Sequence, residues 1–210
     1  GFDTVVAGEH HFSDFIMSVP QMFLSWLAGQ YKNVRLASGV TLLPHHDPVR
    51  LAEDFATLDV LSDGRAEMWV GKGVEPGVYA HFGQQAEEAA ARQEEGLSLL
   101  RRLWVEPNLS WTGRFRPPLE NVTLEPRPVQ QPHPPVYVSC SNPDSVEVPA
   151  RLGFNLVMTG LAFDLDQLPL MVARYRELWD HHGHAYEPRI TLLAHVHVAE
   201  SSQEARDHLR

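Results

Sequence analysis

The chain has 210 residues, of which 43% are hydrophobic and 21% are charged, a composition typical of one globular domain. Seventeen Lys and Arg against twenty-seven Asp and Glu give a formal net charge of -10, and no basic cluster appears, so we expect no nucleic-acid partner. Cys140 is the only cysteine, which excludes an intrachain disulfide and a thiolate metal cluster and favours a cytoplasmic location. No apolar run reaches the roughly 18 residues of a transmembrane helix, so we expect no membrane association.

Apolar, often β-branched segments alternate with helical patterns along the chain, which predicts βα units around a parallel sheet. The predicted strands are residues 4–7, 34–41, 66–71, 136–140, 155–159 and 190–198. The predicted helices cover about residues 18–30, 47–62, 87–104, 164–182 and the segment from 201 onward. The sequence therefore predicts six βα units.

Six units are fewer than the eight that close a (β/α)8 TIM barrel of about 250 residues. Because the chain starts at a strand edge and ends inside a predicted helix, we expect one barrel domain over residues 1–210, a fragment without its first and last βα units. Residues 105–135 carry eight of the sixteen prolines and show no sustained period. A segment of this kind inside a compact domain is usually functional or a cover over a site, and we expect it to help cover the site.

Polar side chains follow four predicted strands, at the ends where parallel α/β folds gather catalytic groups. These groups are Glu9-His10-His11, His45-His46-Asp47, Gly71-Lys72-Gly73 and Ser141 to Ser145. Histidine exchanges protons near neutral pH, and a lysine between glycines suits a phosphate. The fourth group begins a helix, so its serines either bind an anion or only cap the helix. The first group likewise fits catalysis or a hydrogen-bonded loop.

Two further histidine groups are open to structural and functional interpretations. His181, His182 and His184 lie at a predicted helix end, where the dipole favours them as surface residues. His195 and His197 alternate along the last predicted strand, a spacing that fits either a metal site or strand packing.

The ordered set of motifs resembles the bacterial luciferase-like flavin-dependent monooxygenase family. The resemblance covers nearly the whole chain and rests on the motifs GFDT at 1–4, EHHF at 9–12, LPHHDPVR at 43–50, AED at 52–54, LSDGR at 61–65, GKG at 71–73 and PPVYV at 134–138 with its Ser-rich exit. It implies a (β/α)8 barrel of which this chain spans the second to seventh strands.

The resemblance implies functions for eight positions. His10 matches the family's catalytic histidine beside the flavin, and Glu9 precedes it within the cofactor site. Gly39-Val40 matches a non-prolyl cis peptide beneath the isoalloxazine ring. The resemblance also implies a phosphate site. Lys72 stands at a position of that site that is usually Arg, and Ser141, Asn142 and Ser145 lie at the helix start that follows the fourth predicted strand.

The implied activity is oxidation of a small organic substrate by molecular oxygen and reduced FMN, supplied by a flavin reductase, in a pocket that excludes water. The full-length protein is expected to be a dimer. A deazaflavin-dependent hydride-transfer enzyme of the same family is the nearest alternative, because both cofactors use the same pocket. A metal-dependent barrel hydrolase, suggested by the groups at His10-His11, His45-His46 and His195-Val196-His197, and a non-catalytic flavin-binding relative are further alternatives.

Overall fold

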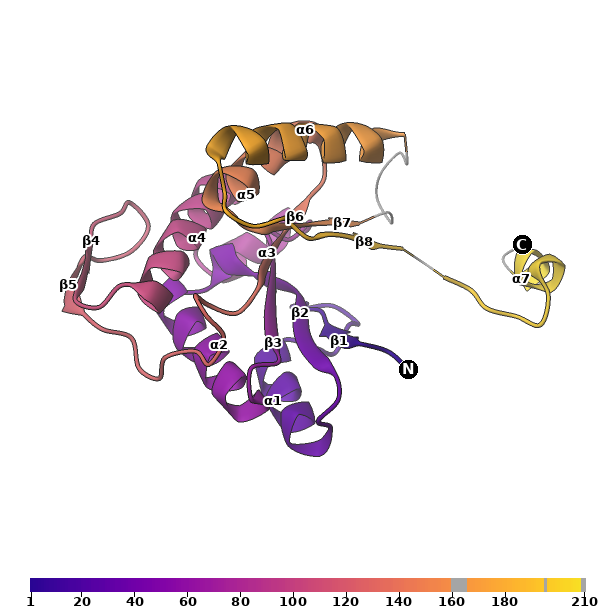
Figure 1. Ribbon diagram of the computed structural model, residues 1–210, viewed down its shortest axis with the longest axis horizontal. Coiled ribbons are helices and arrows are strands. Elements are labelled where there is room, and N and C mark those ends of the chain that lie inside the picture. The colour runs from indigo at the N-terminus through magenta and orange to yellow at the C-terminus, as the bar shows by residue number, and fades with distance from the viewer. Residues whose placement is uncertain (160–165, 195, 209–210) are drawn as a thin grey trace.

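A computed structural model describes residues 1–159, 166–194 and 196–208, and six parallel strands form its central sheet (Figure 1). The strands lie in the order β1-β2-β3-β6-β7-β8. Their bounds are β1 Thr4–Ala7, β2 Arg35–Leu42, β3 Ala66–Gly71, β6 Val136–Cys140, β7 Asn155–Thr159 and β8 Ile190–Leu193. All neighbouring strands pair in parallel, and the curved sheet with its helices is part of a (β/α)8 barrel, as predicted.

The last predicted strand is wrong in length. It was expected over residues 190–198, but β8 ends at Leu193. His195 lies outside the described residues, and His197 follows the strand and contacts His208 through ring nitrogens 3.0 Å apart. The alternation of apolar residues in this segment therefore does not report a continuous strand.

Helices cover one face of the sheet and enclose the main core (Figure 1). The covering helices are α1 Pro20–Gln30, α2 Pro48–Ser62, α4 Ala89–Val105, α5 Glu147–Leu152 and α6 Gln167–His182. The short α3 Pro76–His81 follows β3, and α7 Ser202–His208 lies apart from the sheet (Figure 1). The other face of the sheet buries a smaller cluster of Ala37, Trp69, Tyr137 and Val157. Strand side chains alternate between these two faces, which is why β2, β3, β6 and β7 contribute to both clusters.

The helix ends follow the sequence signals in most places. Asp47 caps α2 by accepting a hydrogen bond from the Val49 amide at 2.9 Å, and Asp63 ends that helix in the left-handed conformation. In α1 the expected contribution of Ser18 is wrong, because the cap residue is Val19 and Pro20 alone sets the first turn. The expected cap at Asp164 lies outside the described residues.

Residues 105–135 do not cover the site, contrary to the prediction. They contain an antiparallel hairpin, β4 Leu109–Trp111 and β5 Leu119–Val122, which lies beyond α4 and away from the sheet (Figure 1). Near the end of the segment, Gln130 donates two hydrogen bonds to the buried carboxylate of Asp59 in α2. The prolines therefore belong to a connection that runs along the outside of the helices.

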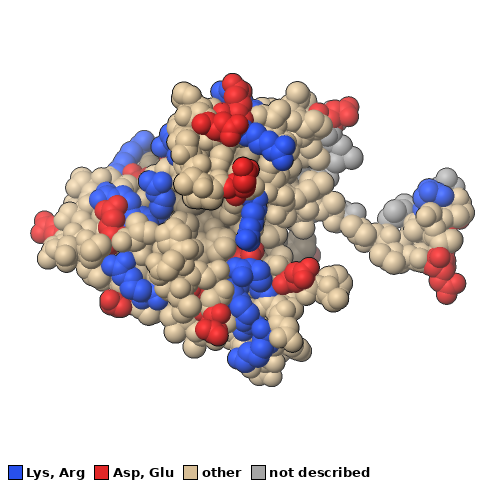
Figure 2. All heavy atoms as spheres, viewed as in Figure 1, with Lys and Arg blue, Asp and Glu red and all other residues tan. Residues whose placement is uncertain are grey.

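The described part of the chain also contains the 3-10 turns η1 Leu43–His45, η2 Ala86–Glu88 and η3 Pro143–Val146. Positive and negative side chains lie interspersed over the face seen in Figure 2. Within the described residues, no helix combines the length and apolar character needed to cross a bilayer.

Candidate active site

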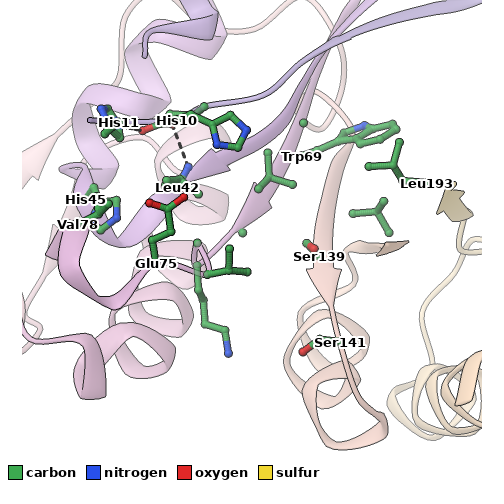
Figure 3. Close-up of a pocket in the computed structure, with 18 residues that line it drawn as sticks. His10, His11, Leu42, His45, Trp69, Glu75, Val78, Ser139, Ser141 and Leu193 are labelled. Atoms are coloured by element: carbon green, nitrogen blue, oxygen red, sulfur yellow. Dashed lines mark hydrogen bonds and ion pairs between the residues drawn. The ribbon is translucent and has the colours of Figure 1, made fainter. Parts of the chain in front are cut away.

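A cavity of about 400 Å³ opens at the carboxyl ends of the strands (Figure 3). Its wall is built from residues within β2 and β3 and from residues that follow β1, β2 and β3, together with Ser139 of β6, Ser141, Val157 of β7 and Leu193 of β8. The sheet topology therefore brings together the strand-end groups that the sequence predicts, since parallel strands end on the same side.

Apolar side chains from within the strands form much of the wall. Val40, Trp69 and Val157 belong to the interior cluster, and the Trp69 ring lies 5.3 Å from that of Tyr137. Sequence reasoning missed Trp69, Ser139 and Val157, because it collected only polar groups after the strands. The alternation of β3 was the available signal, since Trp69 shares a face with the wall residue Gly71.

Two glycines shape the same wall. The Gly39-Val40 peptide is cis, as the resemblance implies. A β-carbon at Gly39 would overlap the side chain of Val6, and one at Gly71 would lie 2.5 Å from Cγ2 of Val40. Both positions therefore exclude any larger residue unless a valine moves.

Glu9, a residue of the cavity wall, joins three segments of the chain through its side chain. Its side chain is 0% exposed; Oε1 lies 2.7 Å from both His11 Nε2 and His46 Nε2, and Oε2 accepts from the Leu42 amide at 3.0 Å. Burial by itself would raise the pKa of Glu9, but the bonds from the two histidines and Leu42, with the charge of His46, lower it. Glu9, predicted to bind the cofactor, thus has both oxygens engaged within the protein.

His10 points toward the open centre of the cavity, across from Trp69, whereas His11 and His45 lie together at one side (Figure 3). The His10 ring stacks on Phe15 with centroids 4.4 Å apart, and its backbone amide donates to Met17 at 2.8 Å. These contacts hold the ring in place and leave it accessible to a ligand.

His45 is a second wall histidine, in the group that the sequence singled out after β2. Its Nδ1 lies 3.2 Å from Gln84 Oε1, and its ring stacks on Phe82. Burial lowers the pKa of His45 below its ordinary value of 6.5, so the ring is neutral at physiological pH.

Lys72 supplies the positive charge of the wall. Among the described residues its ammonium has neither an ion pair nor a hydrogen bond, while its carbonyl accepts from the Tyr79 hydroxyl. Lys72 is therefore free to bind an anion.

The predicted phosphate loop is divided between wall and helix cap. Ser141 lines the cavity, whereas Asn142 and Ser145 form a reciprocal capping box at η3. The Ser141 amide donates to Ser145 Oγ at 3.1 Å, so the capping pair also fixes the backbone of the wall residue. Beside them, burial raises the pKa of the Cys140 thiol to about 12, and this side chain packs against the helices.

The histidines at the end of α6 differ from one another. His181 and His182 are exposed, as interpreted from the sequence. His184 instead places Nε2 2.6 Å from the Ala150 carbonyl and packs on Trp179. Within the described residues, no three His, Cys, Asp or Glu side chains are placed to hold a metal ion.

A family model described as luciferase-like monooxygenase matches residues 1–210. The chain belongs to this family. Among solved structures, the luciferase-like chain is similar to monooxygenase RslO1 from Streptomyces bottropensis, with 31% identity, a TM-score of 0.91, and coverage of 99% of this chain and 64% of that one. A second similar structure is the oxygenating constituent of 3,6-diketocamphane monooxygenase from Pseudomonas putida, solved in complex with FMN, with 22% identity and a TM-score of 0.85. The match covers 100% of this chain and 61% of that one, and it supports the fold.

Characterised relatives of this luciferase-like chain include the oxygenase component of the flavin-dependent trigonelline monooxygenase of Acinetobacter baylyi, at 29% identity over 98% of this chain. The N-acetyl-S-alkylcysteine monooxygenase of Bacillus subtilis is 29% identical over the whole chain. The chain spans 58% of the first relative's length and 61% of the second's.

Proposed function

We propose that the chain is the oxygenase part of a flavin-dependent monooxygenase that uses reduced FMN and molecular oxygen to oxidise a small organic substrate. The observation that carries the proposal is the cavity itself. It combines an apolar wall, an accessible histidine at His10 and, at Lys72, a cation without a partner among the described residues, in a chain of the luciferase-like family. The names of its relatives, a flavin-dependent oxygenase component among them, support this activity and a reductase partner. A cytoplasmic location, expected from the single cysteine, is part of the same proposal.

The residues present fit a flavin nucleotide. A cavity of about 400 Å³ lies within the roughly 300–1,000 Å³ range of cofactor and ligand sites. The face made by Gly39, Val40 and Gly71 has no side chain beyond Val40, which suits contact with a flat ring system. Lys72 and Ser141, with the loop capped by Asn142 and Ser145, would hold the phosphate.

The bound flavin would supply two electrons to molecular oxygen, which oxygen insertion into an organic substrate requires. His10 would donate or accept the proton exchanged with the reacting groups, because its ring reaches the open centre of the cavity. Trp69, Val40 and Val157 would exclude water from the same space, which suppresses loss of the oxidant to solvent.

The test of cofactor binding compares FMN, riboflavin and a deazaflavin by calorimetric titration of the chain. We expect FMN to bind more tightly than riboflavin, which lacks the phosphate, and Lys72→Met to abolish most of that difference. Lys32→Met is the matched control, because Lys32 lies outside the cavity wall and donates a hydrogen bond to the Ala28 carbonyl on α1. Equal affinity for FMN and riboflavin would contradict the phosphate site, and preference for the deazaflavin would favour the hydride-transfer alternative.

The test of activity measures oxygen uptake and oxygenated product with a flavin reductase and candidate small organic substrates. His10→Ala should lower product formation on the order of 10²-fold while flavin binding persists. Full turnover by this variant would exclude His10 as the proton-exchanging group.

Sedimentation of the protein would test the expected dimer, which the exposed Met22 and Trp26 on α1 support.

A further inference from the structure

Glu9 and the two histidines that it contacts form a hydrogen-bonded group with an unusual arrangement. One carboxylate oxygen, Oε1, lies 2.7 Å from His11 Nε2 and 2.7 Å from His46 Nε2. The other oxygen accepts the Leu42 amide, so the carboxylate cannot rotate without losing a buried bond. The three side chains are 0%, 13% and 27% exposed for Glu9, His11 and His46.

The protonation of this group follows from the donor and acceptor count. The lowered pKa of Glu9 makes it an ionised acceptor at neutral pH. Both imidazoles must therefore carry hydrogen on Nε2, since an ionised carboxylate has nothing to donate. Nδ1 is then the only nitrogen of a neutral His11 that can take up a proton, and no hydrogen bond to it is recorded within the described residues.

The three wall histidines differ in their nearest partners. His11 lies in the cavity wall and has the ionised Glu9 at hydrogen-bond distance, whereas His10 stacks on Phe15 and His45 bonds the neutral Gln84. The titratable or charged groups near His11 are Glu9 and His10 on its own segment, His45 and His46 at η1, and Lys72 and Glu75 in the same wall; His81 on α3 packs against the adjacent Phe12.

We infer that His11 is a proton acceptor of the cavity, in addition to His10, and that Glu9 and His46 are positioning residues that hold His11 with Nδ1 free. The inference deepens the proposed function and rests on it. In the step, an O–H or N–H bond of the bound substrate breaks, its electron pair stays on the substrate, and the proton bonds to Nδ1. Glu9 compensates the charge of the resulting imidazolium, as an orienting carboxylate does for other acid–base histidines.

His46 supports the arrangement from outside the cavity. It lines a separate small hollow beside Arg92, Glu95 and Arg116, and reaches Glu9 from that side. Its N–H adds to the bonds that keep the carboxylate ionised. The site predicts a substrate that presents an acidic O–H or N–H group to the His11 side of the cavity.

The first experiment is independent of activity. Long-range ¹H–¹⁵N NMR of the chain labelled at histidine reports which ring nitrogen carries hydrogen, and His11→Asn assigns the His11 signals. We expect the Nε2–H form for His11 at pH 7 in the wild type, and a mixture of the two neutral forms in Glu9→Gln. Glu75→Gln, which changes another wall carboxylate, should leave the His11 form unaltered. An Nδ1–H form in the wild type would overturn the inference.

The second experiment measures kcat/KM for product formation. His11→Gln should lower kcat/KM on the order of 10²-fold. Glu9→Gln should lower it less, because the imidazolium formed in the step loses its counter-charge. Wild-type kcat/KM in both variants would overturn the inference. If the chain bound no flavin, the NMR result would still stand, so the two proposals fail separately.

Discussion

Gly71 provides a direct test of how closely the cavity wall is packed. In Gly71→Ala the new β-carbon would lie 2.5 Å from Val40 Cγ2 and 3.3 Å from Val40 Cβ. Carbon atoms pack at about 3.5–4.0 Å, so Val40 must move by about 1 Å. Its β-branched side chain is stiff, and its carbonyl accepts a hydrogen bond from the Glu9 amide, which restricts that movement.

The expected cost follows from overpacking. Inserting one methyl group into such a site destabilises a protein by roughly 1–3 kcal/mol. For a chain of this length, about 1 kcal/mol corresponds to a decrease in Tm of roughly 2–4 °C. Because the displaced valine forms part of the proposed flavin-binding face, FMN affinity should fall as well.

The assay is urea unfolding followed by circular dichroism, with FMN titration of the same samples. Val40→Ala removes the methyl groups that Gly71→Ala meets, so the double variant should lose less stability than the two single effects predict, by about 1 kcal/mol or more. Gly29→Ala is the control, since its β-carbon meets nothing within 4 Å on α1. Wild-type stability and FMN affinity in Gly71→Ala would refute the packing argument.

Four further outcomes can be measured. Asp59→Ala should cost about 1–3 kcal/mol in urea unfolding, because the Gln130 backbone amide loses its acceptor and Gln130 Nε2 keeps only the Ala66 carbonyl; an unchanged midpoint would contradict this. Asp47→Ala should cost roughly 0.5–2 kcal/mol through loss of the α2 cap, and an equal loss in Asp47→Asn would argue against capping. The thiol of Cys140, with its pKa raised to about 12 by burial, should resist iodoacetamide at pH 8 until the protein is unfolded, so fast native labelling would disprove its burial. Burial lowers the pKa of His45, so the folded protein favours the neutral ring, and this contribution to stability is fully present above the unfolded pKa of about 6.5. The free energy of unfolding should decrease as pH falls through the folded pKa, and it should decrease less in His45→Gln. Equal pH dependence of the free energy of unfolding in the two proteins would exclude the effect.

The sequence by itself determined the parallel sheet. The strands β1, β3, β6 and β7 match their predicted residues, because nearly continuous apolar runs between helical patterns have few other solutions in a parallel α/β fold. The same topology brought the strand-end groups of Glu9, His45 and Lys72 into one cavity. The family motifs added the cis peptide at Gly39-Val40, which no local propensity could have indicated.

Only the tertiary structure decided how the site residues interact. Glu9 and His46 are 37 residues apart, and their contact depends on how β1 and η1 end beside each other. The inward direction of Trp69 depends on the pairing of β3 with both neighbours. The position of the proline-rich segment outside the helices depends on the long-range bonds between Gln130 and Asp59. Periodicity reports which residues are buried, whereas contacts between distant segments are set by the packing of the whole sheet and its helices.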